Sequence, residues 1–292
     1  MSAPLNDPAT TTDSHFDIAG ITVPSFLYGT AWKESATERL TRLALNAGFR
    51  GIDTANQRKH YHEVGVGKAL AWAFDEGLVT RDQLFLQTKF TYVRGQDHRL
   101  PYDPRADHPT QVRQSMASSL EHLHVEWLDS YVLHGPAQRH GLSTADRDVW
   151  RTMEELQRAG KTRLLGVSNV SAEQLQALCT HATVPPAFVQ NRCYARFGWD
   201  REVRAVCREF GVVYQGFSLL TANRDEMRCG DFVQLRQRIG RTSAQIVFRF
   251  ARQLGMIRLT GTSDREHMRE DLACDDFQLS DADMQLIENI AS

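Results

Sequence analysis

Side chains that can exchange protons stand at the ends of short apolar runs in this sequence. Asp53, Lys89 and His134 each close such a run and supply a carboxylate, an amine and an imidazole. Hydroxyl and amide side chains close further runs, at Ser168–Asn169, Gln190–Asn191 and Ser218. Charged groups at the ends of apolar strands need partners, so these side chains are expected to converge. Gathered in one place, they would form an acid–base site.

Each charged residue also has a plain structural interpretation. Asp53 would cap a turn, Lys89 would leave the sheet into solvent, and His134 would be a hydrogen-bonded core histidine. Only the recurrence of such residues at successive strand ends favours a catalytic site over these interpretations.

The elements that carry these residues follow a repeating pattern. Short, largely apolar runs predict eight buried parallel strands, at Phe26–Thr30, Gly51–Ala55, Leu84–Lys89, Leu128–His134, Arg163–Ser168, Ala187–Asn191, Val212–Phe217 and Met256–Gly261. Helical periodicity lies between them, at Thr37–Ala47, Glu63–Glu76, Thr110–Leu123, Arg147–Arg158, Ser171–Leu178, Arg201–Phe210 and Ser243–Gln253. The alternation predicts an α/β fold, a (β/α)8 TIM barrel with its active site at the C-terminal strand ends. An open doubly wound sheet is the competing fold.

The segment before the first barrel strand sets the domain boundary. Phe16–Val23 predicts a short N-terminal β-hairpin that turns at Ala19–Gly20. The polar residues 1–15 are expected to form a disordered leader, and residues 16–292 a single barrel domain.

Composition narrows the range of molecules that the protein is expected to bind. The 292 residues carry a formal net charge of −2 without long runs of like charge, which argues against nucleic-acid binding. No window approaches about 18 consecutive apolar residues, so no membrane span is expected. The five cysteines contain no C-x-x-C pair and no metal-ligand motif occurs, so no metal site is expected. We expect a soluble cytoplasmic protein, monomeric or weakly homo-oligomeric, that acts on a small molecule.

Glycine patterns of nucleotide-binding loops are missing or incomplete. No G-x-G-x-x-G follows a strand, so a Rossmann site is unsupported. Gly65-Val-Gly67-Lys68 lacks the full P-loop spacing and its Ser or Thr, so close helix packing is the better explanation of these glycines.

Five segments, in order along the chain, resemble the aldo-keto reductase superfamily. They are Gly48–Ala55 (GFRGIDTA), Leu86–Phe90 (LQTKF), Asp129–His134 (DSYVLH), Gly160–Asn169 (GKTRLLGVSN) and Thr242–Gln245 (TSAQ). The resemblance runs from about Phe16 to Leu272, and the I-D-T-A and G-K-x-R-x-x-G-V-S-N segments are its specific parts. It implies a barrel that transfers a hydride between a nicotinamide cofactor and a carbonyl.

The resemblance also implies a catalytic tetrad of Asp, Tyr, Lys and His. Asp53, Lys89 and His134 fall directly on the family's positions. A phenol with a pKa near 10 is a poor acid unless a cation stabilises its anion. Lys89 would supply that cation, Asp53 would hold Lys89 charged, and His134 would orient the substrate oxygen.

The proton donor is the member that the sequence places least directly. The family pattern D-T-A-x-x-Y-x-N-E fits here only with a loop about two residues longer, shifted by one. Tyr61 is the only tyrosine in this loop and is the expected donor, while His60 is the alternative. His62 stands where the family has asparagine.

NADPH is the cofactor that the resemblance implies, with NADH also possible. Ser168 and Asn169 match the pair that holds the carboxamide, and Gln190 matches their neighbour. Phe217 stands where a tyrosine commonly stacks on the nicotinamide, with plain core packing as the alternative. Further cofactor contacts are expected from Thr30, Asp53, Ser218 and Leu220.

The segment expected at the cofactor's 2′-phosphate departs from the family. Gly261 replaces the usual lysine and His267 the usual arginine. The helix that begins near Asp264 offers backbone N–H groups, and a protonated His267 would add a charge below pH 6.5 or so. The other candidates in this segment are Thr262, Ser263, Arg265 and Asp271. We therefore expect weaker discrimination against NADH than the family usually shows.

Aromatic residues beyond the strand ends suggest the substrate. Trp32, Phe90 and Tyr92 are expected to line an apolar pocket, with core packing as the alternative for each. The predicted function is NAD(P)H-dependent reduction of aldehydes or ketones by an NADP-dependent aldo-keto reductase of the alcohol dehydrogenase type. The irregular loop around Tyr61 leaves a non-catalytic, cofactor-binding regulatory or scaffold protein on the same barrel as the alternative.

Overall fold

A β-hairpin opens the part of the chain that the computed structural model describes, residues 15–291. Strands β1 (His15–Ile18) and β2 (Ile21–Pro24) pair antiparallel. Ala19 and Gly20 turn between them at φ 52° and 74°, as a tight hairpin requires. The predicted hairpin is confirmed. The leader expected at residues 1–15 lies outside the described residues, except for His15, which begins β1.

Eight parallel strands form a closed barrel, in the order β10-β3-β4-β5-β6-β7-β8-β9. They are β3 (Phe26–Gly29), β4 (Gly51–Asp53), β5 (Phe85–Phe90), β6 (Leu128–Leu133), β7 (Thr162–Ser168), β8 (Phe188–Arg192), β9 (Val213–Phe217) and β10 (Ile257–Thr260). Each falls within two residues of a run predicted from the sequence. The predicted (β/α)8 fold is confirmed.

Helices alternate with the barrel strands. They are α1 (Thr37–Ala47), α2 (Glu63–Asp75), α3 (His108–Leu123), α4 (Thr144–Arg158), α5 (Ala172–His181), α6 (Arg201–Phe210), α7 (Gly230–Ile239), α8 (Ser243–Gln253), α9 (Arg265–Leu272) and α10 (Asp281–Glu288). Short 3₁₀ helices occur at Glu34–Ala36, Arg81–Gln83, Val93–Gly95, Ala195–Phe197, Glu226–Arg228 and Ala273–Asp275.

Helices α7 and α10 have no counterpart among the helical stretches predicted from the sequence. Helix α7 buries only Phe232 and Leu235, so its apolar periodicity is weak. Helix α10 begins with a capping box in which Ser280 and Asp283 bond each other's backbone N–H, a pattern that the sequence does contain.

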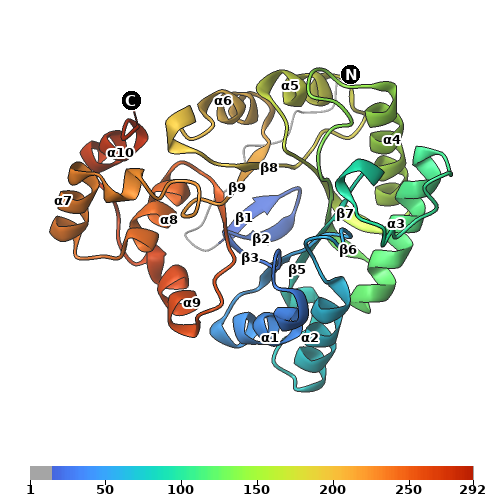
Figure 1. Cartoon of the computed structure of the whole chain (residues 1–292), viewed down its shortest axis with the longest axis horizontal. Coiled ribbons are helices and arrows are strands. Elements are labelled where there is room, and N and C mark those ends of the chain that lie inside the picture. The colour runs from blue at the N-terminus through green and yellow to red at the C-terminus, as the bar shows by residue number, and fades with distance from the viewer. Residues whose placement is uncertain (1–14, 292) are drawn as a thin grey trace. The chain divides into compact units, whose positions relative to one another are not determined.

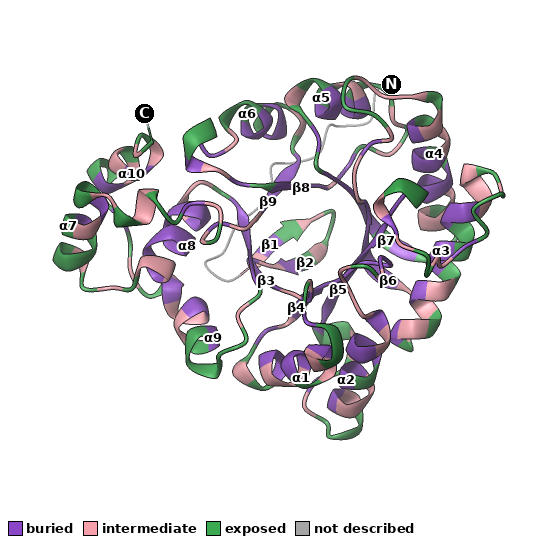
Figure 2. Cartoon of the chain, viewed as in Figure 1, coloured by how far each residue is buried: buried purple, intermediate pink, exposed green. Residues whose placement is uncertain are grey.

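The chain forms two compact units, of which one runs from Tyr28 to Val189. In this unit α1 to α4 lie outside β4 to β7 (Figure 1). Strands β4 to β7 are buried except at Arg163 of β7, whereas each helix is buried on one face and exposed on the other (Figure 2). Asp53 lies opposite Gln87 in the β4–β5 register, so the C-terminal ends of these two strands adjoin.

The other unit combines the chain before Tyr28 with the chain from Gln190 onward. Its core holds a buried charge, because Arg258 on β10 is fully buried and donates to the Asp275 carboxylate at 2.8 Å and to the Ser25 hydroxyl at 2.7 Å. Among the residues that the structure describes, none of the helices is at once long and apolar enough to cross a membrane.

Candidate active site

A buried ion pair joins the ends of β4 and β5. The Lys89 Nζ lies 2.6 Å from the Asp53 carboxylate and donates to the Thr54 carbonyl at 2.8 Å. The Gln87 amide donates to the same Asp53 oxygen at 2.7 Å. Lys89 and Asp53 are only 0% and 3% exposed, so each charge depends on the other. Burial lowers the pKa of Lys89, and the Asp53 carboxylate opposes that shift.

The Tyr61 ring lies beside this ion pair. The Lys89 Nζ is 5.3 Å from the centroid of the Tyr61 ring, and the His134 ring packs edge-on against it at 5.9 Å between centroids. Burial, followed by the Asp53 carboxylate, raises the pKa of Tyr61 above its ordinary value. Tyr61 therefore keeps its proton at neutral pH, as a proton donor must.

The loop that carries Tyr61 turns His60 toward other partners. The backbone N–H groups of His60 and Tyr61 both donate to the Gln57 carbonyl, at 3.0 and 2.9 Å. The His60 ring stacks on Trp32 with centroids 3.9 Å apart, and its Nδ1 lies 2.9 Å from the Gln57 side-chain oxygen. Of the two candidate donors, the structure brings Tyr61 against Lys89 and His134.

His134 follows β6 and is held by Thr91. The Thr91 hydroxyl lies 2.7 Å from His134 Nδ1, and the Tyr102 hydroxyl donates to the Thr91 carbonyl at 2.6 Å. Burial lowers the pKa of His134 to about 3, and the Lys89 charge and His60 add to the shift. The imidazole is therefore neutral at neutral pH. When Thr91 donates to Nδ1, the proton of the ring is on Nε2 and is available to a substrate oxygen.

The lowered pKa of His134 predicts an acid-side loss of stability. An unfolded histidine binds a proton near pH 6.5, whereas His134 in the fold does so only near pH 3. Between these values the unfolded state binds more protons, so the free energy of unfolding falls as the pH is lowered through that range. Urea titrations of the wild type and His134→Asn should show a smaller fall in the variant. His140→Asn, at an exposed histidine, is the control, and an equal fall in all three proteins would contradict the assignment.

Besides Asp53, three residues expected at the cofactor lie in the same unit. The Thr30 backbone N–H and hydroxyl both donate to the Asp53 carbonyl, at 2.9 and 3.0 Å. Asn169 adopts a left-handed conformation, φ 56°, and its amide donates to the His134 carbonyl at 2.8 Å and to the Ser168 hydroxyl at 3.1 Å. Asn169 thus hydrogen-bonds Ser168 to the segment that carries His134.

Four of the expected cofactor residues lie around β8 and β9 of the other unit. The Gln190 amide donates to the Gln215 side chain at 2.9 Å. Phe217 is half-buried, with the Arg192 guanidinium 5.8 Å from its ring centroid. Ser218 takes a left-handed conformation, φ 57°, and Leu220 is half-buried.

The segment expected at the 2′-phosphate follows β10. Ser263, Arg265 and His267 are exposed, and Thr262 is half-buried. The Asp264 carboxylate accepts from the backbone N–H groups of Glu266 and His267, at 2.8 and 3.1 Å. These two N–H groups, which were expected to be available to the phosphate, are therefore already bonded. Asp271, also expected at the cofactor, is instead buried and accepts from Thr260 at 2.8 Å.

The expected substrate-pocket residues separate into two groups. Trp32 is 71% exposed, as a pocket wall open to substrate would be. Phe90 is fully buried and packs against Tyr102, while the Tyr92 hydroxyl donates to the buried Asp146 carboxylate at 3.0 Å. The structure therefore places Phe90 and Tyr92 in the core, the alternative that the sequence left open.

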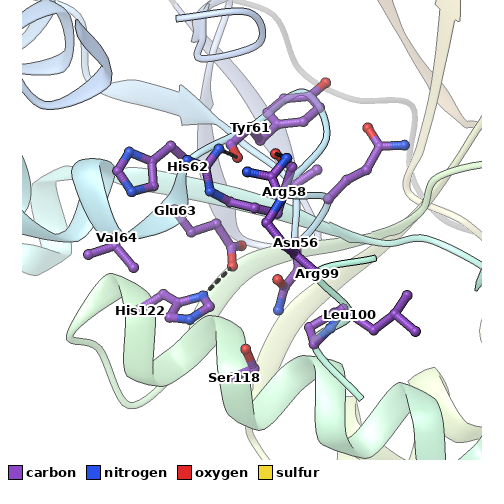
Figure 3. Close-up of a pocket in the computed structure, with 13 residues that line it drawn as sticks. Asn56, Arg58, Tyr61, His62, Glu63, Val64, Arg99, Leu100, Ser118 and His122 are labelled. Atoms are coloured by element: carbon purple, nitrogen blue, oxygen red, sulfur yellow. Dashed lines mark hydrogen bonds and ion pairs between the residues drawn. The ribbon is translucent and has the colours of Figure 1, made fainter. Parts of the chain in front are cut away.

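A pocket of about 290 Å³ lies on another side of the loop (Figure 3). It is lined by residues 55–58, 61–64 and 99–101 together with Ser118 and His122. Neither Lys89 nor His134 lines it, and the Tyr61 ring points away from Ser118 and His122. Of the four acid–base groups, only Tyr61 therefore borders this pocket. The described residues contain no cluster of three or more His, Cys, Asp or Glu that could hold a metal ion.

Sequence comparison identifies the family. The model of the Aldo/keto reductase family matches residues 26–292. The chain belongs to this family. Aldo-keto reductases are NADPH-dependent oxidoreductases that act on carbonyls, so the predicted class of reaction and its cofactor are confirmed.

Relatives match this aldo-keto reductase along nearly its whole length. The NAD(P)H-dependent 6'-deoxychalcone synthase of Glycine max is 28% identical over 303 residues, which cover 97% of this chain and 90% of that protein. The NADPH-dependent codeinone reductase 1-2 of Papaver somniferum is 30% identical over 295 residues, covering 93% and 87%. A solved aldo-keto reductase from Bombyx mori, in complex with NADP, has a TM-score of 0.77 at 22% identity, covers 93% and 90%, and supports the fold.

Proposed function

We propose that this aldo-keto reductase reduces aldehydes or ketones to alcohols with Tyr61 as the proton donor, and that it is of the alcohol dehydrogenase type. The observation that carries the proposal is the buried Lys89–Asp53 ion pair at 2.6 Å, with the Tyr61 ring beside it. A scaffold protein would have no need to keep this costly buried charge next to a phenol.

The chain's own groups supply the acid catalysis. His134 Nε2–H orients the carbonyl oxygen of the substrate, and Tyr61 gives that oxygen its proton as hydride reaches the carbon. The alkoxide that develops is a much stronger base than a phenolate, so the transfer is downhill even though the pKa of Tyr61 is raised. Lys89 stabilises the resulting phenolate, which then recovers a proton from solvent.

The residues present fit a nicotinamide dinucleotide. NADPH, when bound, supplies the hydride. Asn169 and Ser168 offer amide and hydroxyl groups for the carboxamide, and Phe217 offers an aromatic face. The hydroxyl, guanidinium and imidazole groups after β10 are donors that suit a phosphate, at the half-buried Thr262 and the exposed Ser263, Arg265 and His267.

A carbonyl panel tests the proposed function. NADPH oxidation, followed by absorbance with aldehydes and ketones of increasing apolar size, should proceed with at least one compound class and depend on Tyr61. Cofactor binding without turnover across the panel would favour the regulatory or scaffold alternative instead.

Cofactor preference should respond to position 267. Replacing His267 by arginine restores a permanent charge near the expected phosphate, and charge-assisted hydrogen bonds contribute about 1.5–3 kcal/mol. His267→Arg should therefore bind NADPH about tenfold more tightly or better, with NADH affinity unchanged.

Fluorescence titration with both cofactors measures these changes. Arg269→Ala, on the same helix but paired with Glu266 at 3.6 Å, is the control and should change neither affinity. A gain for NADPH and NADH alike in His267→Arg would mean that residue 267 does not face the 2′-phosphate.

A further inference from the structure

A buried carboxylate follows the proposed proton donor by two residues in the chain. Glu63 is the first residue of α2, two positions after Tyr61, and its side chain is only 2% exposed. It accepts hydrogen bonds from the Thr88 hydroxyl at 2.5 Å and from the Ser119 hydroxyl at 3.0 Å, and it pairs with His122 Nδ1 at 3.2 Å. One carboxylate thus connects α2, β5 and α3.

The hydrogen bond to Thr88 connects Glu63 to the residue next to Lys89. Thr88 and Lys89 are successive residues of β5, so their side chains leave opposite faces of the strand. Lys89 contacts Asp53 on one face, while Thr88 contacts Glu63 on the other. Tyr61 precedes Glu63 by only two residues in the chain. The Glu63–Thr88 hydrogen bond therefore links the loop that carries Tyr61 to the strand that carries Lys89.

Close packing of α2 on α3 holds the carboxylate in place. A Cβ atom at Gly67 would lie 2.0 Å from the His122 carbonyl oxygen, so only glycine permits this approach of the two helices. Ser119 and His122 are three residues apart on one face of α3 and both face Glu63. The Glu63–His122 pair forms one side of the pocket in Figure 3. The glycine pattern at residues 65–67 is thus explained by helix packing, as the sequence predicts.

We propose that Glu63 is a positioning residue, which fixes the distance between Tyr61 and Lys89 through its hydrogen bond to Thr88. The proposal rests on the proposed function of Tyr61 as proton donor. None of the described hydrogen bonds and ion pairs of Glu63 reaches Lys89 or the Tyr61 ring. Glu63 acts by holding the loop that carries Tyr61 against β5, which carries Lys89. Moving a buried carboxylate away from its donors is costly, so the contact resists displacement during turnover.

Two matched hydroxyl deletions test the proposal. Thr88→Val and Ser119→Ala each remove one hydroxyl that donates to Glu63, and both positions are fully buried. Only Thr88 adjoins Lys89. Thr88→Val should lower kcat by about 10- to 100-fold, since small misplacements of reacting groups have effects of this size, while KM and the affinity for NADPH change little. Ser119→Ala should stay within about twofold of the wild type in kcat, and Thr88→Ser, which keeps the hydroxyl, should restore it.

Crystal structures of the same variants give a readout that does not need turnover. In Thr88→Val the Tyr61 ring should move away from Lys89 Nζ, beyond the present 5.3 Å, and in Ser119→Ala it should stay. Equal effects of the two deletions on kcat, or an unmoved Tyr61 in Thr88→Val, would overturn the positioning role. If the wild type reduces no carbonyl, the proposed function fails, and the two crystal structures still decide whether Glu63 positions Tyr61.

Discussion

Replacing Tyr61 by phenylalanine is expected to lower kcat for carbonyl reduction by about 100-fold or more, the usual scale of a lost general acid. Phenylalanine keeps the ring that packs edge-on against His134 but removes the hydroxyl that carries the proton. The affinity for NADPH should be unchanged. Steady-state kinetics with the best substrate of the panel, together with a cofactor titration, measures both quantities.

His60 provides the matched control for this prediction. Its ring is occupied by Trp32 and Gln57, so His60→Ala should lower kcat far less than Tyr61→Phe. An active Tyr61→Phe together with an inactive His60→Ala would assign the donor to the histidine and shift the loop register by one residue.

Replacing Lys89 by methionine is expected to lower kcat by about 100- to 1000-fold, the loss typical when a charge-stabilising group is removed. Without the ammonium group, nothing in the described contacts of Tyr61 stabilises a phenolate. The same change leaves the buried Asp53 carboxylate without its cation, and breaking a buried pair on one side costs about 3–5 kcal/mol of stability.

A double variant separates the catalytic loss from the loss of stability. Lys89→Met with Asp53→Asn removes both charges, and the Gln87 side chain still has a polar partner at position 53. Thermal unfolding should show that the double variant recovers much of the stability, while kcat stays as low as in Lys89→Met. Recovery of kcat along with the melting temperature would mean that the ion pair serves the fold alone.

The positions of the strand-end residues were predictable because two independent features of the sequence and the fold point to them. The apolar runs fix where β4, β5 and β6 end, and parallel strands of a barrel bring those ends together. Asp53 and Lys89 meet for this reason. The period of two along a strand also determines which way the neighbours of Lys89 face. Since Lys89 faces Asp53, Phe90 had to face away and Thr91 had to face the same side as Lys89, which accounts for a core phenylalanine and for the bond from Thr91 to His134.

The proton donor and its support were not accessible in the same way. Which of His60 and Tyr61 faces Lys89 depends on how the loop bonds to Gln57, and no periodicity describes such a loop. Glu63 looks like an ordinary residue of a helix first turn, where carboxylates are common. Its role becomes visible only when three elements distant in sequence bring Thr88, Ser119 and His122 to it.

The division of the chain into two units separates two properties that natural selection can tune. All four acid–base groups, Asp53, Tyr61, Lys89 and His134, belong to the unit from Tyr28 to Val189. The residues expected to distinguish NADPH from NADH come after Gln190, with Gly261 and His267 as the departures. Substitutions that change the preference between NADPH and NADH can therefore accumulate without disturbing proton transfer. Substitutions in the segment expected at the 2′-phosphate and an unchanged set of residues around Lys89 are therefore compatible within a single gene.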